Sequence, residues 1–105
     1  MSILRQLPPT ELDSKLQAVP NSDADVTAKD AWLFELHVNN TTAGAVTLTV
    51  LDKQATPVAL ISAESIAANA TKIYSWRQGV FMKGGINWVG GAVGLRAAVY
   101  ARVAP

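Results

Sequence analysis

Residues 31–51 read AWLFELHVNNTTAGAVTLTVL, and this stretch decides the fold class. Apolar and polar side chains alternate in both halves of it, which is the period of a half-buried β-strand. The side chains expected to face the core are Trp32, Phe34, Leu36, Val38, Val46, Leu48 and Val50. Those expected to face outward are Glu35, His37, Asn39, Thr47 and Thr49. The turn-rich segment 40–44 between the two halves predicts that they form a β-hairpin.

The same period continues to the end of the chain. Short strands are predicted at 58–62, 72–76 and 86–89, with Gly79 ending the second of them and paired glycines bounding the third. The last strand, 95–103, has one apolar face and one polar face. Short strands at this regular spacing predict an all-β fold, either an antiparallel β-sandwich or a jelly-roll-like arrangement.

Residues 1–30 have a different character. Thr10 is placed to cap a helix, Leu12 and Leu16 share one helical face, and Pro20 closes the stretch, which predicts a short helix. A polar connector follows it. The domain organisation expected is therefore an N-terminal arm with a short helix and a polar connector at 1–30, followed by a β-sandwich domain at 31–105.

Composition excludes several classes of function. The chain has no cysteine, and His37 is the single histidine, which removes thiolate metal sites and most catalytic triads. The net charge of +1 argues against a nucleic-acid partner. No apolar run approaches the ~20 residues that a membrane span needs, and the N-terminus lacks the pattern of an export signal. We expect no enzyme, and no catalytic, metal-binding or cofactor-binding residues.

Three groups of residues are candidates for chemistry. Glu35 and His37 share an outward strand face, and they are interpreted as a solvated polar pair because no third orienting group is apparent. Asp23 and Asp25 resemble half of a calcium loop, but the remaining ligands do not follow at the required spacing. Among the tryptophans, Trp32 is expected in the core. Trp76 and Trp88 border glycine-rich turns and stay open as a platform for a sugar ring.

The β region is small for a self-sufficient core, since such cores supply only about 3–5 kcal/mol without a staple. Association with another chain is the usual compensation. An apolar N-terminal arm and a loop that mixes cations with apolar anchors suit such contacts, although core packing is the alternative for the two apolar residues of the loop. The predicted partner-binding residues are Ile3, Leu4, Leu7, Arg77, Phe81, Met82 and Lys83.

Three segments occur in a distinctive order: WLFELHVNNTTAGAVTLTVLD, ESIAANATKIYSW and GVFMKGGINW. Together they resemble a recurrent pattern in small β-sandwich structural proteins of tailed bacteriophages, and the resemblance covers about residues 32–89. It implies a virion structural protein and, more narrowly, a capsid decoration (cement) protein. No catalytic or cofactor residue is implied.

The resemblance, together with the missing export pattern and the small size of the β region, implies a location and partners. The chain would be made in the host cytoplasm and become part of the capsid, with the major capsid protein as its partner. Self-association is expected, with a trimer favoured because threefold positions of a shell are common docking points, and a dimer as the alternative. The alternative function is a host-recognition or carbohydrate-binding module of a tail or baseplate.

Overall fold

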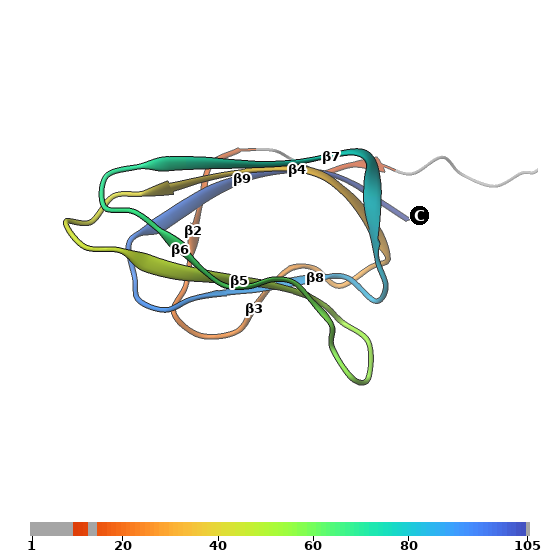
Figure 1. Ribbon diagram of the computed structural model, residues 1–105. Coiled ribbons are helices and arrows are strands. Elements are labelled where there is room, and N and C mark those ends of the chain that lie inside the picture. Colours follow the sequence, from red (N-terminus) through yellow and green to blue (C-terminus); the bar gives the residue numbers. More distant parts are fainter. Residues whose placement is uncertain (1–9, 13–14, 105) are drawn as a thin grey trace, which may run out of the picture.

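The computed structural model describes residues 10–12 and 15–104, and in this part of the chain every regular element is a β-strand (Figure 1). Two antiparallel sheets pack face to face. The first contains β1 (Thr10–Glu11), β2 (Gln17–Val19), β4 (Ala31–Asn40), β7 (Thr71–Met82) and β9 (Leu95–Val103). The second contains β3 (Ala24–Thr27), β5 (Val46–Asp52), β6 (Ala59–Ile66) and β8 (Ile86–Gly90). The predicted antiparallel β-sandwich is confirmed. No helix long and apolar enough to cross a membrane occurs among the described residues.

The strand pairs are nested within one another. β5 pairs with β6, β4 with β7, β3 with β8, and β2 with β9, all antiparallel. The strand order is β1-β9-β4-β7 in the first sheet and β3-β8-β5-β6 in the second, and β2 joins the same edge of β9 as β1. The chain therefore passes from one sheet to the other at almost every loop.

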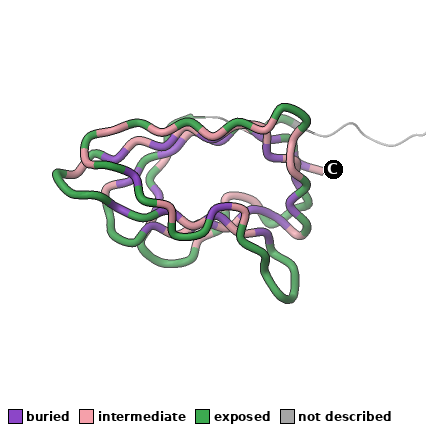
Figure 2. Tube along the Cα trace, viewed as in Figure 1, coloured by how far each residue is buried: buried purple, intermediate pink, exposed green. Residues whose placement is uncertain are grey.

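The core lies between the sheets and is built from small and branched apolar side chains. Buried and exposed positions alternate along the strands (Figure 2). The inward prediction for Val46, Leu48 and Val50 is confirmed, since each is at most 6% exposed. The alternation predicted for β9 is also confirmed, and its buried residues are Leu95, Ala97, Val99, Ala101 and Val103. In β5 and β9, strict alternation in the sequence therefore correctly predicts which side chains are buried.

The predicted hairpin between residues 31–39 and 45–51 is wrong. β4 pairs with β7 and β9, whereas β5 pairs with β6 and β8, so the two strands lie in different sheets. The connecting turn crosses the sandwich and is held by the buried side chain of Asn40. Its amide nitrogen donates to the carbonyl oxygens of Gly44 (2.8 Å) and Ile66 (2.9 Å). Both arrangements bury the same apolar faces, so alternation alone does not distinguish them.

The predicted facing of Trp32 and Phe34 is also wrong. Leu33 is fully buried instead, whereas Trp32 and Phe34 are half-buried on the outer face. A β-bulge is the reason: Leu33 pairs with Ala101 and Glu35 with Tyr100, so that Phe34 is an extra residue in β4. Beyond the bulge the predicted facing holds, and Leu36 and Val38 are buried.

The bulge in β4 is matched by a larger irregularity in β7. Leu33 pairs with Val80 and Glu35 with Ser75, so residues 76–79 lie opposite Phe34. Gly79 does not end the strand as predicted, because β7 runs on to Met82. It has a φ of +80°, and a Cβ atom on it would lie 2.8 Å from the Phe34 ring. The missing side chain is what allows this aromatic ring to lie over the strand.

The predicted short helix near Thr10–Pro20 is wrong for the described residues. β1 and β2 occupy this stretch and pair with β9, with Thr10 opposite Val103 and Gln17 opposite Ala97. A helix of two turns is marginal alone, whereas the edge of β9 offers unpaired backbone groups. Strands on both sides of the boundary predicted at residue 30 belong to the same two sheets. The predicted arm at residues 1–9 lies outside the described residues.

Candidate functional site

The outer face of the first sheet presents aromatic and apolar side chains to solvent. Ile73 is 60% exposed, Phe81 48% and Tyr100 40%. Half-buried rings accompany them on the same face. We call this surface the outer aromatic face, and its members are Trp32, Phe34, His37, Ile73, Phe81 and Tyr100. An apolar surface of this kind on a small domain is typical of an interaction site.

The strand register arranges these side chains in rows. Trp32 lies between Phe81 on β7 and Arg102 on β9, and its ring contacts that of Phe81 at a centroid distance of 5.2 Å. The His37 and Tyr100 rings also contact each other, with centroids 5.1 Å apart. These cross-strand contacts hold the rings in defined positions on a rigid sheet.

A groove of about 430 Å³ opens beside these rows, where Glu11 and Leu12 lie against β9. Its lining residues are Glu11, Leu12, Phe34, Tyr100, Ala101 and Arg102. Glu11 pairs with Arg102 across the sheet, but no hydrogen bond or ion pair joins either side chain to another described residue. The groove therefore combines two aromatic rings with one carboxylate and one guanidinium group.

Glu35 and His37 form a polar pair on the outer aromatic face. The His37 Nε2 and Glu35 Oε2 atoms are hydrogen bonded, and the Ser75 hydroxyl donates to Glu35 Oε1 at 3.4 Å. Both side chains remain about one-third exposed. Among the described residues, no group of three or more His, Asp or Glu side chains comes together to hold a metal ion. The pair thus links neighbouring positions of β4 and β7 on the outer aromatic face.

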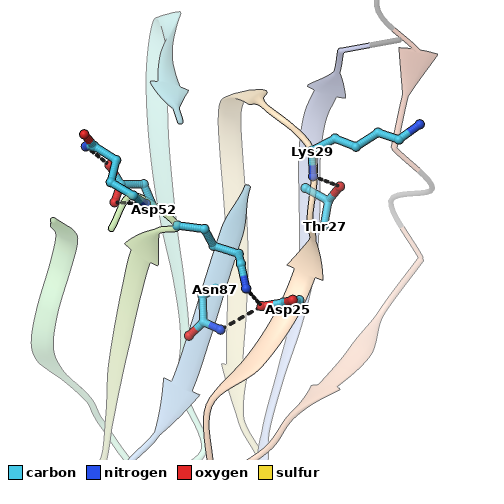
Figure 3. A network of polar contacts seen from close by, with 7 residues as sticks. Asp25, Thr27, Lys29, Asp52 and Asn87 are labelled. Carbon is cyan, nitrogen blue, oxygen red and sulfur yellow. Dashed lines mark hydrogen bonds and ion pairs between the residues drawn. The ribbon is translucent and has the colours of Figure 1, made fainter. Parts of the chain in front are cut away.

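A polar network on the second sheet involves Asp25, one of the two carboxylates that resemble half of a calcium loop in the sequence (Figure 3). Its Oδ1 atom accepts hydrogen bonds from Lys53 Nζ at 2.7 Å and from Asn87 Nδ2 at 2.9 Å. These bonds, the lysine first, lower the pKa of Asp25. These two bonds connect β3 to β8 and to the loop after β5. The ammonium group of Lys53 also balances the charge of the Asp25 carboxylate.

Asp52 organises the loop that follows β5. Its carboxylate accepts hydrogen bonds from the backbone N–H of Val58 at 2.9 Å and from the side chain of Gln54. The Val58 N–H first, and then Gln54, hold the pKa of Asp52 below its ordinary value of 3.8. The ion pair with Lys72 likewise lowers the pKa of Glu64, whose ordinary value is 4.5. The hydrogen bonds of the folded state therefore favour the ionised forms of Asp25, Asp52 and Glu64.

We predict that acid destabilises the fold. Carboxyls with a lowered folded pKa stabilise the fold above their unfolded pKa, and this contribution is lost as the pH falls through the folded value. The free energy of unfolding should decrease from about pH 5 to about pH 3, and Asp52→Asn should make this decrease shallower. Urea denaturation across this range measures both slopes. Asp23→Asn, which removes a nearby charge but none of these bonds, is the control. Equal slopes for wild type and Asp52→Asn would contradict the role of Asp52.

The structure separates the predicted partner-binding residues. Phe81 belongs to the outer aromatic face, and Arg77 and Lys83 are exposed. Met82 is only 2% exposed and belongs to the core, as its alternative interpretation stated. The apolar residues of the predicted arm, Ile3, Leu4 and Leu7, lie outside the described residues.

The tryptophans do not form a common platform. Trp88 is 2% exposed and packs in the core, so it cannot receive a sugar ring. Trp76 is half-buried and stacked on Tyr74, with centroids 6.2 Å apart. Trp32, expected in the core, lies on the outer aromatic face instead.

The groove residues were not singled out from the sequence. Tyr100 and Arg102 appeared only as members of the polar face of the last strand. Phe34 was placed in the core, and the single hint of its outward position was Gly79 in the neighbouring strand. Glu11 was assigned to a helix. A groove assembled from three distant segments has no local signature.

Comparisons with known proteins identify no relative. A scan of protein-family models found no match to the chain, and searches of curated proteins and of solved structures returned no significant match.

Proposed function

We propose that the protein is a structural component of a bacteriophage virion, acting as a capsid decoration (cement) protein between major capsid subunits. The observation that carries this proposal is the outer aromatic face, where Ile73, Phe81 and Tyr100 are each at least 40% exposed. Leaving such side chains in water opposes solubility unless a partner covers them. A protein partner of similar apolar character suits this surface.

The architecture supports the same proposal. Nested antiparallel pairing across two sheets is the arrangement of a jelly roll, a fold that occurs in viral capsid domains and in lectins. Rigid sheets with short loops suit a part that must keep its shape on a shell. The resemblance of residues 32–89 to phage structural proteins points in the same direction.

A cement protein works by burying surface on neighbouring subunits, so that separating the subunits also breaks the added interfaces. Stable interfaces bury about 1,200–2,000 Å² in total. A body of 105 residues reaches this area most readily as a homo-oligomer, with a trimer favoured and a dimer as the alternative. The segment with Ile3, Leu4 and Leu7 is proposed as a second contact.

The test uses purified particles from a host that produces the chain. Wild-type protein should be present in a fixed simple ratio to the major capsid protein, as measured by quantitative mass spectrometry. Phe81→Ser and Ile73→Ser should weaken attachment about tenfold or more, since truncated anchor residues lose at least about 1–2 kcal/mol of binding free energy. Val58→Ser is the matched control, because Val58 is 59% exposed but lies in the loop before β6.

Two results would refute the decoration proposal. One is the absence of the chain from particles, and the other is equal retention of the Phe81→Ser and Val58→Ser variants. Light scattering coupled to size-exclusion chromatography measures the oligomer, and a monomer at all concentrations would remove the self-association proposal alone.

A second candidate function is a host-recognition module of a tail or baseplate that binds carbohydrate. The groove beside the outer aromatic face favours it, because two aromatic rings and two groups of opposite charge line the same concave surface. A few copies per particle, rather than one per capsid subunit, would favour this candidate.

A further inference from the structure

We propose that the groove lined by Phe34, Tyr100, Arg102 and Glu11 binds a neutral saccharide. The proposal names the site and the ligand class for the second candidate function and rests on that function. Sugar binding in this groove does not depend on attachment to a capsid through Phe81, because Phe81 does not line the groove.

The position of Phe34 is the first step. Alternation with the buried Leu36 and Val38 would put it in the core, yet the bulge in β4 turns it outward to line the groove. The opposing segment of β7 accommodates the ring with Gly79 at a positive φ. Two irregularities in neighbouring strands thus present one aromatic ring on the outer surface. Bulges that re-aim a side chain are over-represented beside functional sites.

The aromatic pair suits the apolar face of a sugar ring. Phe34 and Tyr100 both line the groove, and Tyr100 is 40% exposed although its ring also contacts His37. The face of an aromatic ring carries partial negative charge. The C–H groups on one side of a pyranose carry the complementary partial positive charge and an apolar surface. A sugar ring can therefore cover surface that water hydrates poorly.

The charges then select among ligands. Glu11 and Arg102 are cross-strand neighbours of opposite sign that line the same groove. A singly charged ligand of either sign would be attracted by one of these groups and repelled by the other, so its charge gains little net attraction. A neutral ligand rich in hydroxyl groups satisfies both, because each hydroxyl both donates to the carboxylate and accepts from the guanidinium.

The size of the groove agrees with this class of ligand. Its volume of about 430 Å³ lies within the range of about 300–1,000 Å³ that is usual for small-molecule sites. A predominantly apolar wall with a few polar groups that fix orientation is also usual for such sites. The structure thus favours one or two sugar units of a longer neutral glycan.

The test is saturation-transfer NMR with a panel of neutral methyl glycosides and disaccharides of glucose, galactose, mannose and N-acetylglucosamine. Sialyllactose and glucosamine are the anionic and cationic arms. We expect transfer to at least one neutral member, and a weaker signal or none for both charged members. Titration calorimetry with the best member then gives the dissociation constant.

The variants are Arg102→Gln and Tyr100→Ala, each expected to weaken binding about tenfold or more. Arg96→Gln is the matched control, since Arg96 lies on the same outer face of β9 but does not line the groove. Its affinity should equal that of wild type. Arg102 is exposed, so Arg102→Gln keeps the test valid if Tyr100→Ala does not fold.

Three outcomes would overturn the groove assignment: no transfer to any neutral member at millimolar concentration, stronger binding of a charged member, or equal affinities of Arg102→Gln and Arg96→Gln. Measuring how well particles adsorb to host cells distinguishes a wrong groove assignment from a wrong host-recognition function. If Arg102→Gln particles adsorb normally and wild-type adsorption depends on the chain, host recognition stands and the groove assignment falls.

Discussion

Replacing Leu33 with alanine is expected to lower the free energy of unfolding by about 2–5 kcal/mol, the range for fully buried leucines. Leu33 is 0% exposed and belongs to the core cluster between the two sheets. Removing its branched end leaves a cavity that the rigid strands around it cannot close. Because small domains are stable by only about 5–15 kcal/mol, this is a large share of the total.

The neighbouring Phe34→Ala variant is the control, and it should cost only about 1–2 kcal/mol because its half-buried ring loses less burial than a core ring does. Urea denaturation followed by circular dichroism measures both values. The order of the two effects matters more than their size. If Phe34→Ala is the more destabilising of the two, Phe34 is a core residue and the bulge in β4 is not present in solution.

Replacing Asn40 with alanine is expected to cost about 2–5 kcal/mol, since each buried polar group left without a partner costs about 1–3 kcal/mol. Asn40 is 0% exposed, and its side chain satisfies four groups. Its amide nitrogen donates to the carbonyls of Gly44 and Ile66, and its oxygen accepts from the backbone N–H and the hydroxyl of Thr42. These bonds hold the crossing from β4 to the second sheet.

Asn39→Ala is the matched control for this variant. The Asn39 side chain lies on the outer face and makes one exposed hydrogen bond, to the Thr71 hydroxyl at 2.9 Å. Its loss should cost at most about 1 kcal/mol. Thermal unfolding by calorimetry compares the two adjacent asparagines directly. Equal melting temperatures for both variants would show that Asn40 does not stabilise the crossing.

The Glu35–His37 pair shows how far a candidate site is visible in sequence. Two residues separated by one position in a strand share a face, so their proximity follows from the period alone. The groove is different, because Glu11, Phe34 and Arg102 come from strands far apart in the chain. Only the pairing of β9 with both β1 and β4 brings them together.

The sequence by itself determined that residues 31–104 form β-strands and which face of β5 and β9 is buried. These properties depend on alternation within one strand, which a two-residue period specifies locally. The tertiary structure decided that β4 and β5 lie in different sheets and that Thr10–Glu11 and Gln17–Val19 are strands. It also decided that Phe34 faces outward. Each of these outcomes depends on backbone hydrogen bonds to a distant strand, and their free energy exceeds the weak local preference of a short segment.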